Sequence, residues 1–264
     1  MEGKAPLVVA HRGSNADEPE HSLASYLLAV QEGADAVECD VRLTADGELV
    51  LVHDRRIDRT SSGRGVVSAM TLAELSEHDF SVGESWQQLE REPNPARSAV
   101  LTLPTMLEAI LDASPTMQFS IETKHPIRYG KYVEEELLST LERFGLAHPK
   151  SPEESRVRVM SFSQLAVRRM RRLLPELPSV LLMERIPRRR RDGSLPGTTQ
   201  VAGICIDRLH DMPDYVQRVH DRGGEVHVWV VDTPDDVRLC LDLGVDAIIS
   251  NRPAMVRAVL LANR

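Results

Sequence analysis

The chain alternates, from one end to the other, between short apolar segments rich in β-branched residues and longer amphipathic segments. Eight apolar segments have the length of β-strands, and they lie at residues 7–10, 36–42, 118–122, 156–160, 180–183, 203–207, 226–231 and 246–250. Most segments between them repeat apolar residues at helical spacing, as Leu23, Leu27 and Val30 do. Strands that are each followed by a crossover predict an α/β protein with a closed (β/α)8 TIM barrel. An open, doubly wound parallel sheet remains the alternative, because periodicity alone does not exclude it.

Two regions interrupt this alternation: residues 43–103, which hold a hairpin and an insertion, and residues 184–199. Asp46 and Gly47 stand between apolar runs, which is typical of a hairpin and predicts an extra strand appended to the second barrel strand. Residues 55–103 are too long for a plain loop, so we expect a small insertion over one end of the barrel. A helical pattern is also missing from residues 184–199, where an arginine run occupies residues 188–191. No low-complexity tract divides the sequence, so residues 1–264 are predicted to form a single domain.

Composition and charge narrow the class of protein. The chain has 264 residues, of which 42% are hydrophobic and 27% charged, as is usual for globular proteins. The formal net charge of -8 argues against a general nucleic-acid-binding surface. No apolar run reaches the roughly 18 residues that a membrane helix needs, so we expect no stable membrane insertion. Residues 1–10 lack the features of a secretory signal, and the dispersed cysteines indicate reduced thiols, so we expect a cytoplasmic protein.

Acidic residues collect at the ends of the second and third predicted barrel strands. Glu38 and Asp40 are two residues apart on a strand, so their side chains point to the same face. Glu122 ends the next barrel strand, and active sites of such barrels lie where the strands end. Three carboxylates form a set of oxygen ligands that suits Mg²⁺ or Ca²⁺ better than zinc. Alternatively, basic neighbours neutralise these acids in a buried ion-pair network: Arg12, Arg42 and Lys124.

Two histidines, His11 and His53, each end an apolar strand in the predicted barrel. Two imidazoles beside a phosphate can act together, one by removing a nucleophile's proton and the other by protonating the leaving oxygen. The planar guanidinium of Arg12, next to His11, is suited to binding phosphate oxygens. Three further histidines are less well placed, and we assign them no direct role: His21, His125 and His210.

An ordered series of motifs occupies residues 8–54: His11-Arg12-Gly13, Pro19-Glu20-His21-Ser22, the acidic strand with Glu38 and Asp40, Thr44-x-Asp46-Gly47 and His53-Asp54. Downstream motifs are Leu103-Pro104-Thr105, Glu122-Thr123-Lys124 and Trp229. This series resembles the glycerophosphodiester phosphodiesterase family and covers essentially the whole chain. The resemblance implies a (β/α)8 barrel with an insertion after the second strand. It also implies divalent-cation-dependent cleavage of small-molecule glycerophosphodiesters to glycerol 3-phosphate and an alcohol, within lipid and glycerol metabolism.

The resemblance further implies roles for individual residues. The acid–base catalysts would be His11 and His53. The ligands of one divalent cation, Mg²⁺ or Ca²⁺, would be Glu38, Asp40 and Glu122. The substrate-binding residues would be Arg12 and Lys124 at the phosphate and Trp229 on the glycerol side. The implied mechanism uses the glycerol 2-hydroxyl as an internal nucleophile, and water then opens the resulting cyclic phosphate. Judged without the family, Trp229 is more typical of simple barrel filling.

The sequence departs from the family pattern at two places. His21-Ser22 stands where the family commonly has Asn-Thr, which is a mild change because hydroxyl residues interchange at helix starts. Asn251-Arg252-Pro253 stands where the family often has Thr-Asp-x-Pro. We expect this second departure to affect the local helix cap and not the chemistry.

Two other functions stay open. A barrel retained only for binding should have lost an acid or a histidine, yet none of the proposed residues is missing. A related barrel acting on lysophospholipids or sphingomyelin needs a long apolar groove, and the insertion offers only Phe80 and Trp86 as aromatic residues. The arginine run at residues 188–191 follows the fifth strand, so its loop should lie on the active-site side. There it would steer anionic substrates or contact lipid headgroups, although its loop-like flanks favour a solvated loop.

Overall fold

A computed structural model describes residues 5–82, 94–126, 128 and 130–263 of the chain. Residues 1–4, which precede the first apolar run, and Trp86 of the insertion lie outside the described residues. Within the described part, none of the helices combines the length and the apolar character that crossing a lipid bilayer requires.

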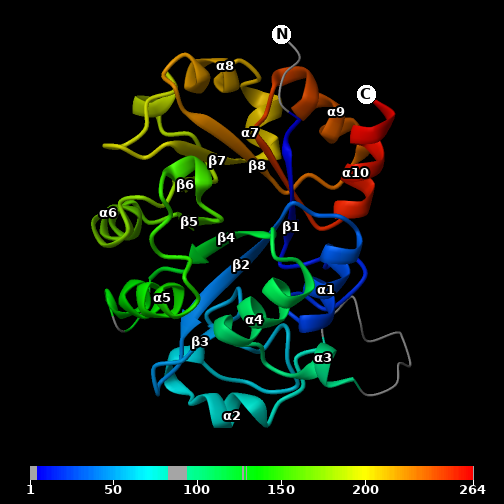
Figure 1. Ribbon diagram of the computed structural model, residues 1–264, viewed down its shortest axis with the longest axis vertical. Coiled ribbons are helices and arrows are strands. Elements are labelled where there is room, and N and C mark those ends of the chain that lie inside the picture. Colours follow the sequence, from blue (N-terminus) through cyan, green and yellow to red (C-terminus); the bar gives the residue numbers. More distant parts are fainter. Residues whose placement is uncertain (1–4, 83–93, 127, 129, 264) are drawn as a thin grey trace.

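Eight parallel strands form a closed barrel, because the first strand pairs with both the second and the last (Figure 1). The barrel strands are β1 (Leu7–His11), β2 (Ala36–Leu43), β4 (Gln118–Thr123), β5 (Val157–Ser161), β6 (Ser179–Met183), β7 (Val201–Cys205), β8 (Glu225–Trp229) and β9 (Ala247–Ser250). Each predicted strand forms, so the (β/α)8 barrel is confirmed and the open sheet is excluded. The strand register pairs His11 with Glu38 and Asp40 with Glu122.

Helices surround the strands on the outside of the barrel (Figure 1). They are α1 (Leu23–Gln31), α4 (Leu103–Ala113), α5 (Tyr132–Arg143), α6 (Gln164–Leu173), α7 (Ile206–Asp211), α8 (Tyr215–His220), α9 (Pro234–Leu243) and α10 (Pro253–Ala262). Hydroxyl side chains cap several helix starts, as Ser22, Thr102 and Thr233 do, by accepting a hydrogen bond from a backbone N–H of the first turn. The core lies mainly between this layer and the strands, where Cys39 and Cys240 are buried as free thiols.

The hairpin after β2 is present as predicted. Strand β3 (Leu49–Leu51) pairs antiparallel with the end of β2 and does not belong to the barrel. The following insertion contains a short 3₁₀ helix (Val67–Ala69), α2 (Leu72–Ser76) and α3 (Pro95–Ser98). Two arginines of this insertion hold the loop between β1 and α1: Arg97 contacts Glu18 at 2.6 Å, and Arg59 contacts Glu20 at 2.8 Å. The insertion therefore lies at the end of the barrel where the strands finish.

The arginine run differs from its expected position. Residues 188–190 form a 3₁₀ helix in which Arg190 is buried, whereas Arg188, Arg189 and Arg191 are exposed. The carbonyl oxygen of Arg191 accepts a hydrogen bond from Arg218, near the end of α8. Because α8 leads into the start of β8, these contacts place the end of the run toward the opposite end of the barrel. The expectation that this loop lies on the active-site side is wrong for its final residues.

Candidate active site

The three predicted acidic ligands converge where β2 and β4 finish. Glu38 and Asp40 share one face of β2, and the register of the strands sets Asp40 beside Glu122. One carboxylate oxygen of each acid lies within 4.8 Å of the other two. The three residues are 2%, 1% and 6% exposed, respectively. The fold thus gathers three buried carboxylates at one point.

Basic groups already contact these acids. The Nζ atom of Lys124 lies 3.0 Å from Oδ1 of Asp40 and 2.9 Å from Oε1 of Glu122. The Nε atom of Arg12 lies 3.2 Å from Oδ2 of Asp40. The backbone N–H of Arg12 donates a hydrogen bond of 3.0 Å to Oε2 of Glu38. The ion-pair network considered as an alternative is therefore present around Asp40, with Arg12 and Lys124 as its basic members.

The charge states of the three acids differ because their neighbours differ. Burial, followed by the negative charge of Asp40, raises the pKa of Glu38 well above its usual range. The same two effects raise the pKa of Glu122 to about 8, although Lys124 opposes them. Burial acts to raise the pKa of Asp40 as well, but the hydrogen bond from His21 and the charge of Lys124 hold it well below its usual range. At neutral pH, Asp40 is therefore ionised, whereas Glu38 and Glu122 favour the protonated form.

This donor set fits a hard divalent cation. Mg²⁺ and Ca²⁺ bind carboxylate oxygens, and zinc sites favour nitrogen and sulfur ligands. Oxygen atoms on opposite sides of one ion, each at about 2.4 Å, would lie about 4.8 Å apart. The separations among Glu38, Asp40 and Glu122 stay within that limit. Both acids with a raised pKa would lose their protons to such an ion, because carboxylates bind metals in the ionised form.

The loop after β1 folds back so that two of its residues contact Asp40. Arg12 has a φ of 55° and His21 has a φ of 59°. In the described part of the chain, no other residue except glycine has a positive φ. Such backbone costs of order 1 kcal/mol or more per residue. Both residues contact Asp40, His21 through Nε2 at 2.9 Å. A Cβ atom on Gly13 would lie 2.3 Å from Oγ of Ser25, so the loop needs glycine there.

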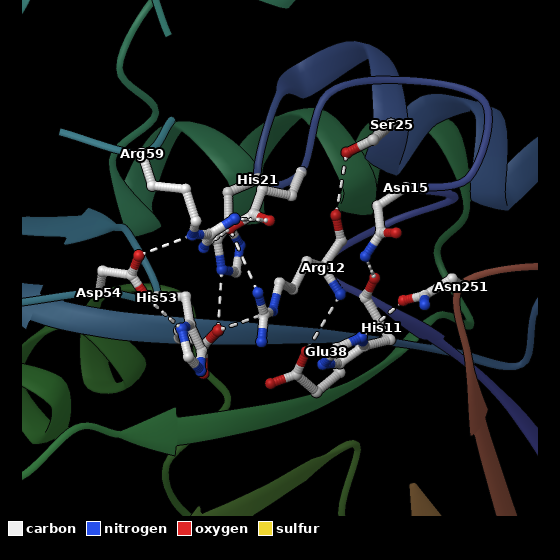
Figure 2. A network of polar contacts seen from close by, with 12 residues as sticks. His11, Arg12, Asn15, His21, Ser25, Glu38, His53, Asp54, Arg59 and Asn251 are labelled. Atoms are coloured by element: carbon white, nitrogen blue, oxygen red, sulfur yellow. Dashed lines mark hydrogen bonds and ion pairs between the residues drawn. The ribbon is translucent and has the colours of Figure 1, made fainter. Parts of the chain in front are cut away.

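His11 is held by a neutral side chain. Its Nδ1 atom lies 2.7 Å from Oδ1 of Asn251 (Figure 2). The amide nitrogen of Asn251 donates a hydrogen bond of 2.6 Å to Asp232, which fixes the amide with its oxygen toward the imidazole. Nδ1 of His11 is therefore the protonated nitrogen, and Nε2 carries the lone pair. Burial, followed by the charge of Arg12, lowers the pKa of His11 to about 3.

His53 is held by a carboxylate. Its Nδ1 atom lies 2.7 Å from Oδ1 of Asp54, and Asp54 accepts a hydrogen bond of 2.7 Å from Arg59 (Figure 2). Burial lowers the pKa of His53 to about 4, with the charges of Arg12 and Lys124 acting in the same direction and Asp40 and Asp54 opposing them. An ionised partner stabilises an imidazolium better than an amide does. The two histidines therefore differ in their readiness to hold a proton.

The predicted residues surround one cavity of about 70 Å³. Seven of the eight line it: His11, Arg12, Glu38, His53, Glu122, Lys124 and Trp229. The indole of Trp229 meets the ring of Phe162 edge to face, with 5.5 Å between the ring centroids. Its Nε1 atom is buried without a hydrogen-bond partner. Trp229 also packs on apolar residues inside the barrel, so it fills the barrel and forms a wall of the cavity.

Sequence reasoning missed several residues of this site. His21 was given no role, yet it contacts Asp40, and its other ring nitrogen lies 2.8 Å from the hydroxyl of Tyr26. The change at Asn251 was expected to concern a helix cap, but this side chain holds His11. Phe162 directly follows the end of β5, and from this position in the sequence its location at the mouth of the barrel could have been predicted.

Comparison with known proteins supports what this geometry indicates. Residues 11–255 match the model of the glycerophosphoryl diester phosphodiesterase family. A Mycobacterium tuberculosis protein named "Probable glycerophosphodiester phosphodiesterase 1" is 46% identical over 258 residues, which cover 97% of this chain and 92% of that protein. A glycerophosphodiester phosphodiesterase of Bacillus subtilis is 31% identical. The alignment covers 96% of this chain and 86% of that protein.

Solved structures share the fold. A phosphodiesterase of Oleispira antarctica, in complex with the product sn-glycerol-3-phosphate, superposes with a TM-score of 0.75 at 26% identity, with 97% of this chain and 96% of that chain covered. A glycerophosphodiester phosphodiesterase from Agrobacterium tumefaciens superposes with a TM-score of 0.77 at 24% identity, with 96% and 100% covered. Taken with the pocket and its motifs, these matches show that the chain belongs to the glycerophosphoryl diester phosphodiesterase family and is a phosphoric diester hydrolase.

Proposed function

We propose that the chain hydrolyses glycerophosphodiesters, such as glycerophosphocholine or glycerophosphoethanolamine, to glycerol 3-phosphate and an alcohol, with one Mg²⁺ or Ca²⁺ ion. The observation that carries the proposal is the meeting of three buried carboxylates and two differently held histidines at one cavity. The product bound to the Oleispira antarctica relative supports glycerol 3-phosphate as the released phosphate ester. The barrel and its insertion at residues 55–103 would act as one domain, and the free thiols support a cytoplasmic location.

Glu38, Asp40 and Glu122 would hold the cation. When bound, the ion would offset the charge of the carboxylates and stabilise the charge that develops on the phosphoryl oxygens. Arg12 and Lys124 line the same cavity and would contact the phosphate with side-chain donors that lie close to the acids.

The different partners of the two histidines support a division of roles. His11 presents a neutral Nε2 lone pair and would take the proton of the glycerol 2-hydroxyl, whose oxygen then attacks phosphorus. His53 is backed by Asp54 and would give its proton to the oxygen of the leaving alcohol. The product of this step is a cyclic phosphate, which water opens while the two histidines exchange roles. The internal nucleophile explains why glycerol is required, because its hydroxyl is held at high effective concentration.

The apolar side of the cavity would bind glycerol. Trp229 and Phe162 form a wall against which the carbon chain of glycerol can pack. The unpartnered Nε1 atom of Trp229 offers a donor for a glycerol hydroxyl. In this proposal, glycerol lies on the side of β8 and the leaving alcohol lies on the side of His53.

Purified protein should release glycerol 3-phosphate from glycerophosphoethanolamine in an enzyme-coupled assay, and a chelator should abolish the activity until Mg²⁺ or Ca²⁺ is restored. Glu38→Gln should lower turnover by about 10³, since a metal-bound oxygen contributes several kcal/mol of charge stabilisation. The control is Glu108→Gln, which changes an exposed carboxylate on α4 and should leave turnover intact. A barrel that only binds its ligand would release no product under any of these conditions.

Cation binding should strengthen with pH. Glu122, with its pKa raised to about 8, holds a proton at neutral pH that the ion must displace. Below pH 8 the affinity should therefore fall as pH falls, by up to about tenfold per unit for each displaced proton. Calorimetric titration with Ca²⁺ between pH 6 and 9, in buffers of different ionisation enthalpy, measures both the affinity and the protons released. An affinity independent of pH, with no proton release, would remove Glu122 from the ligand set.

Asn251→Asp should move the acidic limb of the kcat/KM profile to higher pH. A carboxylate in place of the amide would favour the protonated imidazole of His11, so the base would be lost at a higher pH, by roughly one unit or more. Because burial lowers the pKa of His11 to about 3 in the wild type, profiles of kcat/KM must extend from about pH 2.5 to pH 9 to give the shift. Asn263→Asp adds the same charge at the C-terminal end of α10 and serves as the control. An unmoved limb would contradict the role of Asn251 as the partner that sets the protonation of His11.

The two histidine roles are separable with substrates of different leaving ability. His11→Ala and His53→Ala should each lower turnover of glycerophosphoethanolamine by about 10² to 10⁴. With a p-nitrophenyl ester of glycerol phosphate, whose leaving group needs no proton, His53→Ala should recover most of its activity and His11→Ala should not. The wild type should cleave a substrate that lacks the 2-hydroxyl only slowly. Its rate on that substrate should be as low as the rate of His11→Ala on the normal substrate. Recovery of His11→Ala instead would reverse the assignment.

A further inference from the structure

A second hollow, of about 250 Å³, lies beside the candidate active site. We call it the basic cavity, because three of its lining residues are arginines: Arg42, Arg55 and Arg128. The remaining lining residues are Leu43, Val67, Ser68 and Pro126, so none of its described lining residues is acidic. The volume is below the range of about 300–1,000 Å³ that is usual for drug-sized ligands, so the cavity suits a small group and not an acyl chain.

Two of these arginines lack a carboxylate partner. Arg42 donates from Nε and Nη2 to the carbonyl oxygen of His53, at 3.1 and 2.7 Å, and forms no ion pair with the described residues. Within that same part of the chain, the side chain of Arg55 makes neither a hydrogen bond nor an ion pair. The nearby Arg56 and Arg59 do pair, with Asp58 and with Asp54 and Glu20. Among the described residues, no carboxylate therefore contacts the guanidinium group of Arg42 or of Arg55 directly.

Three segments of the chain run from the active site directly to the basic cavity. Two of them contribute one residue to the active-site cavity and, two residues further on, one residue to the basic cavity. Along the segments after β3 and β4, these pairs are His53 with Arg55 and Lys124 with Pro126. On β2, Asp40 of the acidic cluster precedes Arg42 by the same interval. On β2, where the backbone is extended, two residues span about 7 Å, a distance that a short alcohol can bridge.

We propose that the basic cavity binds an anionic group, such as a phosphate monoester, on the alcohol part of the substrate. This rests on the proposed function, in which the alcohol leaves on the side of His53. The preferred substrates are then glycerophosphodiesters whose alcohol is itself phosphorylated. Guanidinium groups bind phosphate oxygens with charge-assisted hydrogen bonds, and they repel a quaternary ammonium such as choline. The described walls of the cavity carry no aromatic ring that would compensate such a cation.

The test uses three substrates that share a two-carbon alcohol and differ only in its terminal group. Glycerol 3-phosphate is esterified with ethylene glycol, with 2-hydroxyethyl phosphate or with choline, so the terminal group is neutral, anionic or cationic. At low ionic strength and pH 8, kcat/KM should be about tenfold higher for the anionic than for the neutral substrate, and lowest for choline. This preference should weaken as salt is added, because screening reduces it. Equal kcat/KM for the anionic and neutral substrates would overturn the proposal, whereas loss of turnover for all three would count against the proposed function.

Substitutions in the basic cavity and direct binding measurements test the role of the arginines separately from the overall turnover. Arg55→Gln should lower the ratio of the two kcat/KM values, anionic to neutral, toward one, and Arg55→Lys should retain part of it. Arg56→Gln removes a neighbouring exposed charge outside the cavity and should leave the ratio as it is. In calorimetry, 2-hydroxyethyl phosphate should bind the wild type and Arg56→Gln but bind Arg55→Gln at least about tenfold more weakly. Inorganic phosphate that binds as tightly as this alcohol would identify a site for the free ion, and would overturn a role in substrate selection.

Discussion

The carboxylate of Asp40 is almost completely buried and yet remains ionised, a state that is costly in a protein interior unless basic groups surround it. Three residues from different segments meet this requirement: Lys124 from the end of β4, Arg12 from the end of β1 and His21 from the loop that follows. Because Arg12 and His21 adopt left-handed backbone to make these contacts, the loop conformation depends on the buried charge. The position of His11, adjacent to Arg12, follows from the same constraint.

The mouth of the barrel is asymmetric about this charge. On the β8 side, the walls are aromatic and apolar, and His11 is held by an amide. On the side of the β2–β3 hairpin, the histidine is held by a carboxylate, and arginine side chains lie beyond it. A parallel barrel brings both sides to one ring of strand ends, so a phosphodiester can lie across the ring with its two alcohols in different environments. In our proposals, one environment selects glycerol and the other receives the leaving alcohol.

The sequence predicted those features that follow from strand periodicity and barrel topology. The proximity of Glu38, Asp40 and Glu122 could be predicted, because the direction of each side chain follows from its position on a strand and from the order of neighbouring strands. His21 could not be placed, because its contact with Asp40 depends on a left-handed loop residue that no periodic pattern encodes. Asn251 lies 240 residues from His11 in the sequence, and its role depends on the closure of the barrel by β9. The direction of the 184–199 loop was set by contacts with α8, which local sequence does not specify.

The charge balance of the acid cluster separates a metal site from a purely structural ion-pair network. Asp40 contacts both Lys124 and Arg12, and Lys124 also contacts Glu122, so these two bases balance only two of the three acids. One acid exceeds that balance, and burial beside Asp40 raises the pKa of both Glu38 and Glu122, which means that their ionised forms are destabilised in the folded barrel. A folded protein retains such an unfavourable arrangement where function requires it. A divalent cation relieves the repulsion of both acids at once, and this is why the raised pKa values of Glu38 and Glu122 argue for an ion and against ion pairing alone.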